Sequence, residues 1–157
     1  MKIEIKKLYT NERFSEETLC FQCDVYVNGK KAFTADNAGH GGCNDYHAFD
    51  GQGGALDAAC TYAKSLPAEV YCGLTLPSNL DGLINEMIER VQANKIIKRI
   101  LKKAAFVLGG KVMTINRPPS NIAYDWIIQR HPNAMILNTM SFNDASNEIN
   151  RCAGVQP

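Results

Sequence analysis

The chain has 157 residues, of which 45% are hydrophobic and 21% charged, proportions that are ordinary for a globular protein and argue against a disordered one. The net charge is only +1, so no overall field attracts the protein to nucleic acid or to a membrane. No apolar run is long enough to span a membrane, and the first seven residues alternate charged and apolar types. We therefore expect a cytoplasmic protein whose six cysteines are free thiols.

The first third of the chain predicts an antiparallel hairpin. Residues 2–6 alternate charged and apolar types, which indicates a first strand. The same alternation over residues 19–27 predicts a second, half-buried strand. Asn28-Gly29 suits a two-residue hairpin turn, because both positions tolerate positive φ, and residues 32–36 predict the returning strand.

A glycine-rich connector follows at residues 39–54 and holds six of the twelve glycines. Glycine permits backbone conformations that other residues avoid, so we expect a loop here. Residues 55–66 then predict a helix. An apolar piece at residues 70–76, bracketed by two prolines, fits either a strand or an ordered loop.

A long amphipathic segment covers residues 80–104. Its apolar residues keep the helical period up to Val91, but from Ile96 the apolar stripe lies on roughly the opposite side. Either the helix breaks near Ala93-Asn94, or one long helix packs against different partners along its length. We expect the break, because it lets both halves share one core.

The last third predicts a second hairpin and two helices. Gly109-Gly110 separates residues 105–108 from 111–115 and again suits a two-residue turn. A helix is expected at residues 121–130, with Ile122, Trp126 and Ile127 inward. Residues 134–140 predict a strand, and a capping box at Ser141 opens a last short helix to about Arg151.

These elements predict an α+β fold in which two hairpins feed an antiparallel sheet and helices pack on one face of it. No internal repeat, low-complexity tract or linker interrupts the chain. We therefore expect a single domain over residues 1–157.

The connector carries the richest polar chemistry in the chain. Its candidate binding residues, which lie within nine positions, are His40, Cys43, Asn44, Asp45 and His47. In the simplest interpretation, the glycines reverse the chain while Asn44 and Asp45 bond their own backbone. In a second, free backbone N–H groups and the N-terminus of the next helix bind an anionic ligand or partner. The spacing matches neither a P-loop nor a dinucleotide fingerprint.

Two further interpretations give this connector a reactive or metal-binding role. Cys43 would be a nucleophile with His40 or His47 as its base and Asp45 as the group that orients the base, although such sets are seldom so close in sequence. A zinc site would use Cys20, Cys23, Cys43 and His47. Residues three apart on a strand point to opposite faces, which disfavours a shared metal. We expect no metal and no cofactor.

Five cations share one face of the segment that follows residue 94: Lys95, Lys98, Arg99, Lys102 and Lys103. A solvated helical face explains this pattern, because the helix dipole favours cations near the C-terminus. The same face is suited to nucleic-acid phosphates or to an acidic protein surface. No aromatic residues interleave with the lysines, so the pattern does not indicate a platform for single strands.

Residues 14–47 resemble small uncharacterised proteins encoded by phages and other mobile elements. The resemblance rests on Phe14-Ser15-Glu16-Glu17-Thr18 and on the turn Asn28-Gly29-Lys30-Lys31, which leads into Gly39-His40-Gly41-Gly42-Cys43. That group provides no catalytic motif to carry over. The resemblance implies a protein that binds and blocks a host machine, such as a defence nuclease or its complex, in the manner of anti-CRISPR proteins.

We therefore predict a non-enzymatic binding protein whose partner is a host protein or nucleoprotein complex. Contacts would come from residues 39–54 or from the basic face, which also allows nucleic-acid binding. No membrane partner is expected. The alternative is a small enzyme or ligand-binding domain that uses the connector, with Cys43 and His47 as its reactive groups.

Overall fold

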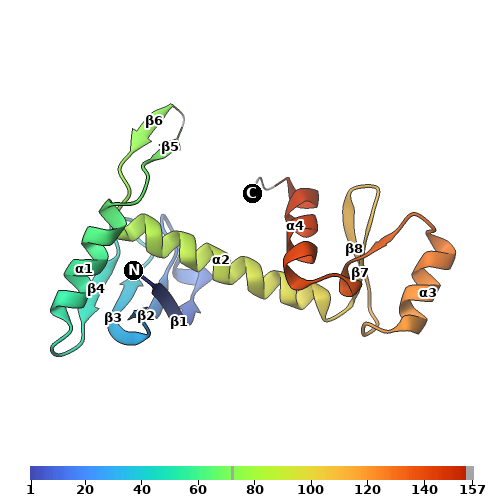
Figure 1. The fold of residues 1–157 in the computed structure, drawn as a ribbon, viewed down its shortest axis with the longest axis horizontal. Helices are drawn as coiled ribbons and strands as arrows, with labels where there is room; N and C mark the ends of the chain where they lie inside the picture. Colours follow the sequence, from blue (N-terminus) through green and yellow to red (C-terminus); the bar gives the residue numbers. More distant parts are fainter. Residues whose placement is uncertain (72, 155–157) are drawn as a thin grey trace. The chain divides into compact units, whose positions relative to one another are not determined.

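The computed structural model describes residues 1–71 and 73–154 and confirms the α+β class (Figure 1). This part of the chain forms four α-helices, a four-stranded sheet, a three-stranded sheet and a two-stranded hairpin. None of these helices is long and apolar enough to cross a membrane. The chain divides into two compact units, Met1–Arg90 and Val91–Pro157, called the first and second unit below. The two predicted hairpins lie in separate sheets, and the single domain stays a prediction.

The sheet of the first unit is antiparallel throughout, in the order β1-β2-β3-β4. Its strands are β1 (Ile3–Thr10), β2 (Phe21–Val27), β3 (Lys30–Asn37) and β4 (Asp45–Ala48). Asn28 and Gly29 have φ of 49° and 82°, which confirms the turn predicted between β2 and β3. Alternate residues of β2, beginning with Phe21, face the core as the sequence predicted.

Strand β4 corrects the prediction that residues 39–54 form one loop. Its backbone pairs with β3, from Phe33 opposite Ala48 to Asp36 opposite Asp45. The sequence hides this strand because it is short, largely exposed and polar, and so lacks the alternation that marks a half-buried strand. Of the candidate residues, Asp45 and His47 therefore lie on an edge strand, whereas His40, Cys43 and Asn44 precede it.

Helices cover one face of this sheet. They are α1 (Gly53–Lys64), two residues earlier than predicted, and the first half of α2 (Leu80–Leu101). Ala59 and Ala63 of α1 and Ile84 and Ile88 of α2 are buried with Phe33 of the sheet. Small residues on α1 let its backbone approach the sheet closely, while the isoleucines of α2 fill the remaining volume.

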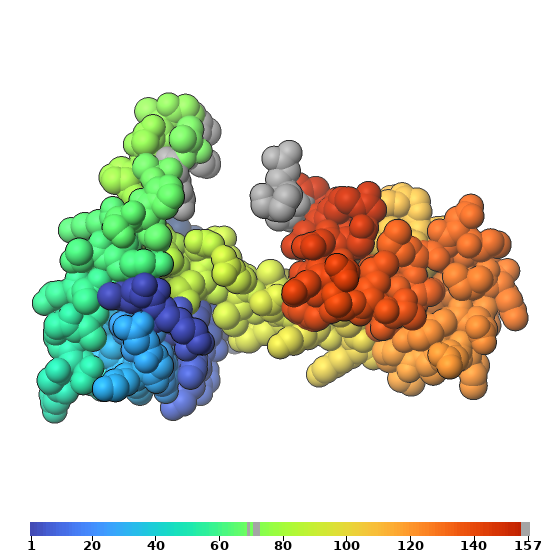
Figure 2. All heavy atoms as spheres, in the orientation of Figure 1, coloured from blue at the N-terminus to red at the C-terminus, as the bar shows by residue number. Residues whose placement is uncertain are grey.

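The apolar piece at residues 70–76 belongs to a hairpin of β5 (Glu69–Tyr71) and β6 (Leu74–Leu76). The hairpin stands away from the rest of the first unit (Figure 2). Val70, Leu74 and Leu76 are all exposed on it.

Helix α2 is continuous from Leu80 to Leu101, so the break expected near Ala93-Asn94 is wrong. The change of phase has a different cause: the two halves of the helix contribute to two separate cores. Ile84 and Ile88 belong to the core of the first unit, whereas Ile97 is buried in the second unit. Each half therefore directs its apolar side chains to a different set of neighbours.

The second unit consists of three layers. Its sheet, in the order β8-β7-β9, is formed by β7 (Ala104–Leu108), β8 (Lys111–Ile115) and the short β9 (Met135–Ile136). Side chains of β7 alternate between two cores, with Ala104 and Phe106 packed with α3 (Asn121–Arg130). Ala105 and Val107 pack with the end of α2 and with α4 (Phe142–Ala153) on the other face.

Two predictions for the second unit need correction. The strand expected at residues 134–140 is reduced to β9, because Leu137–Thr139 form a 3-10 turn. In α3, Ile122 and Trp126 do not point inward: they are 76% and 38% exposed, and Ala123 and Ile127 occupy the core instead. Two large apolar residues within the helical period misled the sequence-based assignment, because a small alanine fits closest to the sheet.

Candidate functional site

A network of buried amides holds the glycine-rich turn that contains His40 and Cys43. Asn37, at the end of β3, is 5% exposed, and its Oδ1 accepts hydrogen bonds from Thr18 Oγ1 at 2.7 Å and from Gly39 N at 2.9 Å. The carbonyl oxygen of Gly39 accepts from three successive backbone N–H groups, those of residues 16–18, at 2.9 to 3.3 Å. These bonds fix the start of the turn against the segment that precedes β2.

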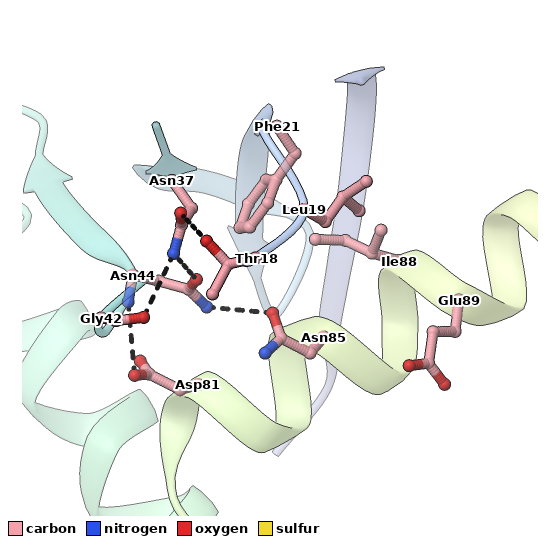
Figure 3. A pocket seen from close by; sticks show the side chains of 10 residues that line it. All are labelled: Thr18, Leu19, Phe21, Asn37, Gly42, Asn44, Asp81, Asn85, Ile88 and Glu89. Carbon is pink, nitrogen blue, oxygen red and sulfur yellow. Dashed lines mark hydrogen bonds between the residues drawn. The ribbon is translucent and has the colours of Figure 1, made fainter. Parts of the chain in front are cut away.

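Asn44 continues the network toward α2 (Figure 3). Its Oδ1 accepts from Asn37 Nδ2 at 3.1 Å, and its Nδ2 donates to Asn85 Oδ1, also at 3.1 Å. The backbone N–H of Asn44 donates to Asp81 Oδ2 at 3.3 Å, and the hydroxyl of Tyr46 donates to Asp81 Oδ1 at 2.6 Å. Burial and the hydrogen bond to Asp81 raise the pKa of Tyr46 well above its ordinary value, which keeps the phenol protonated as a donor.

A cavity of about 240 Å³ lies beside this network, between the start of β2 and the first turns of α2. Leu19, Phe21 and Ile88 form its apolar side, and Asn44, Asp81 and Asn85 its polar side. Its volume is below the usual range for small-molecule pockets, and the amides that line it already bond one another. The arrangement explains a rigid turn better than it explains a ligand site.

The other predicted residues of the connector do not form a common centre. His40 Nδ1 lies 3.1 Å from Glu16 Oε2, and His47 Nε2 lies 3.6 Å from Asp36 Oδ1. Cys43 is exposed, and within residues 1–71 and 73–154 its thiol makes no hydrogen bond to an imidazole. Of these predicted residues, Asn44 joins the buried network through its side chain, and Cys43 joins it only through its backbone carbonyl, which accepts from Asn37 Nδ2 at 3.4 Å.

The zinc ligand set is also dispersed. Cys23 lies in the core of the first unit, where burial raises the pKa of its thiol to about 11, so its thiolate is disfavoured as a metal ligand. Throughout the described residues, no three His, Cys, Asp or Glu side chains lie together in a way that would hold a metal ion.

The five predicted cations are all exposed, but only three of them lie on α2. Lys95, Lys98 and Arg99 are helical, whereas Lys102 and Lys103 lie in the turn after the helix. The side chain of Asn138 secures this turn: its Nδ2 donates to Leu101 O at 2.8 Å and to Lys103 O at 3.1 Å, and its Oδ1 accepts from Ala105 N at 2.7 Å. Backbone carbonyls at the end of the helix are thereby satisfied, and the two lysines stand on a fixed turn.

Arg117, which is not among the five predicted cations, extends this cationic group. Its carbonyl oxygen accepts from Ala104 N at 2.8 Å, which places its backbone beside that of Lys103. The term basic surface denotes these six residues below: Lys95, Lys98, Arg99, Lys102, Lys103 and Arg117.

The basic surface belongs to a strongly cationic unit. Val91–Pro157 contains nine Lys and Arg against three Asp and Glu, a net charge of +6. Met1–Arg90 contains eight against thirteen, a net charge of −5, so the overall +1 conceals two opposite halves. The ion pairs found among the described residues include one in the second unit, between Arg151 and Glu148, and none that involves the basic surface.

An exposed aromatic residue lies on the same unit. The guanidinium carbon of Arg130 is 4.3 Å from the centroid of the Trp126 ring, one helical turn away on α3. The sequence predicts Trp126 in the core, but its ring is exposed and Ala123 of the same helix is buried there.

Comparisons with known proteins do not connect this geometry to an established activity. No protein-family model, no curated protein and no solved structure matches the chain.

Proposed function

We propose that the protein is a non-enzymatic binding protein that attaches to a nucleic acid or a nucleoprotein complex through the basic surface of its second unit. One observation carries the proposal: six exposed cations, none of them in an ion pair among the described residues, gather on a unit with a net charge of +6. Nucleic-acid phosphates bind such surfaces because lysine and arginine side chains displace the counterions that are condensed on the phosphates. The release of these counterions favours binding.

A solvated helix end does not account for this distribution of charge. The helix dipole favours cations in the last turn of α2, where Lys98 and Arg99 lie. It gives no reason for Lys95 a turn earlier, nor for Arg117 on a different segment. A net charge of +6 within 67 residues also destabilises the unit through self-repulsion. A partner with negative charge would relieve that repulsion.

The proposal agrees with what the resemblance of residues 14–47 implies. A host defence nuclease with its nucleic acid is one partner that would present phosphates to the basic surface. No specific observation favours the alternative, an enzyme that uses Cys43 and His47, because the imidazole of His47 lies beside Asp36.

The test measures the anisotropy of a labelled oligonucleotide in the presence of the full chain. The variant Lys102→Glu with Lys103→Glu changes the basic surface, and its control is Lys30→Glu with Lys64→Glu in the first unit. Each pair lowers the net charge from +1 to −3, so the two variants differ only in where the charge is removed. All four lysines are exposed, and neither pair contributes to a core.

We expect the basic-surface variant to lose at least about tenfold in affinity, while the control stays close to the original protein. If all six cations contact phosphates of a single strand, the logarithm of the affinity falls with that of the salt concentration with a slope of about −4. Equal loss in both variants, or binding insensitive to salt, would contradict the proposal.

A further inference from the structure

We propose that the ligand of the second unit is a single-stranded nucleic acid and that one of its bases stacks on Trp126 beside Arg130. This inference rests on the proposed function and specifies the form of nucleic acid. It starts from an aromatic ring that α3 leaves 38% exposed on a cationic unit.

Helix α3 presents an unusual outer surface. Only Ala123 and Ile127 of this helix are buried, while Ile122, Trp126 and Arg130 follow one another at intervals of four residues. Side chains with this spacing lie along one side of a helix. The guanidinium of Arg130 lies over one face of the Trp126 ring, so the two groups form a stacked pair on which an incoming base would add a further layer. Aromatic rings and arginine planes are the groups on which proteins stack unpaired bases.

Chain connectivity joins this stacking pair to the Lys103 and Arg117 end of the basic surface, whereas the cations on α2 belong to the helix that packs on the other face of the sheet. Arg117 lies beside Lys103 through the bond from Ala104 N to Arg117 O, and only residues 118–120 separate it from α3. Ser120 caps the helix by accepting a hydrogen bond from Ala123 N at 3.2 Å. Cations thus lie at both ends of α3, Arg117 before it and Arg130 in its last turn. The helix is ten residues long, about 15 Å, which a few nucleotides of an extended strand would span.

A single strand suits this surface better than a duplex. In a duplex the faces of the bases are stacked inside, so Trp126 would find only sugar and phosphate, whereas an unpaired base offers its face to the ring. Ile122, 76% exposed and one turn before Trp126, adds apolar area for a neighbouring base or sugar. An acidic protein would satisfy the cations equally, but it would make no specific use of an aromatic plane beside an arginine.

The experiment uses the fact that Trp126 is the single tryptophan of the chain, so its fluorescence reports on this position alone. The full chain is titrated with a thymidine oligonucleotide of about twelve nucleotides, and with the same strand annealed to its complement. We expect strong quenching by the single strand and little by the duplex. Anisotropy of the labelled strand then compares Trp126→Ala, Trp126→Phe and, as a control on the same helix, Ile128→Ala.

Trp126→Ala should bind the single strand about 5- to 150-fold more weakly, and Trp126→Phe should retain most of the affinity. The affinity of the Trp126 variants for the duplex should be unchanged. Ile128→Ala should bind the single strand as tightly as the original protein. Single-strand binding without quenching, and with full affinity in Trp126→Ala, would overturn the inference while leaving phosphate binding intact. Polyglutamate that bound as tightly as the oligonucleotide and quenched equally would overturn it too. Failure of both single strand and duplex to bind would reject the nucleic-acid form of the proposed function as well.

Discussion

Asn37 is the side chain on which the glycine-rich turn depends most. It is buried, and it bonds Thr18, Gly39 and Asn44 at once. Asn37→Ala would leave those groups without their partner, so we expect the free energy of unfolding to fall by about 2–4 kcal/mol. Asn85→Ala is the control, because Asn85 is exposed and accepts one bond in the same network; it should cost about 1 kcal/mol or less. Urea denaturation followed by circular dichroism measures the stability of both variants. Equal losses would contradict the conclusion that the turn depends most on Asn37.

Tyr46 should make stability depend on alkaline pH. Its pKa is raised in the folded state by burial and by its bond to Asp81, so the neutral phenol stabilises the fold fully below the unfolded pKa of about 10. As pH rises above that value, this contribution is lost by up to about 1.4 kcal/mol per pH unit. Tyr46→Phe should therefore be less stable than the original protein near pH 8 and approach it between about pH 10 and 11.

The measurement for Tyr46 compares urea midpoints of the two proteins across that pH range. Cys23, whose pKa is raised to about 11 by burial, titrates in both proteins and cancels in the comparison. A difference between the two proteins that stays constant with pH would show that the phenol ionises as readily folded as unfolded.

At the residue scale, the sequence located the polar connector but did not predict which contacts its residues make. Asn44 was a predicted binding residue, and its side chain is instead part of an internal network. Asn37 drew no attention, because hydrophobic periodicity does not distinguish a buried amide from an exposed one. Which polar residues bond one another depends on how β3, β4 and α2 pack, and that information is not local in the sequence.

At the scale of elements, local signals were reliable where turn chemistry and alternation agreed. The Asn28-Gly29 and Gly109-Gly110 turns both have positive φ at each position, and antiparallel strands lie on either side of each turn as predicted. The short strand β4 escaped detection because its pairing with β3, and not its own pattern, defines it. The shift of the apolar stripe to the other side of the helix at residues 91–96 is real, but the break expected from it is wrong. The expectation of a break depends on a single core, whereas the helix contributes to two.

Helix α2 offers a direct test of that correction. Ala93 lies inside an uninterrupted helix, so Ala93→Gly should cost about 1 kcal/mol of stability. Gly82→Ala in the first turn of the same helix should instead gain about 0.5 kcal/mol, since an added Cβ would meet only Asn79 Oδ1 at 3.5 Å. Thermal unfolding measures both. A break at Ala93-Asn94 would make Ala93→Gly neutral or stabilising while leaving the effect of Gly82→Ala unchanged.

At the scale of the whole molecule, net charge was the misleading quantity. An overall +1 suggested no attraction to nucleic acid, yet the second unit alone carries +6 and the first −5. The boundary between the units falls within α2, after Arg90, and no linker marks it. Counting charge by unit was therefore possible only once the fold had defined the units.

The uninterrupted α2 also determines how we expect the chain to unfold. Each half of the 22-residue helix α2 is only about eleven residues long, and isolated helices that short are marginal in water. Each half therefore depends on the core that covers it and supports the other half through continuous hydrogen bonding. Urea unfolding should therefore be one transition, in which Trp126 fluorescence, specific to the second unit, coincides with circular dichroism of the whole chain. Asn37→Ala, although it lies in the first unit, should shift both signals equally. If the circular dichroism signal shifted and the Trp126 transition stayed in place, the units would be independent and the single-domain prediction wrong.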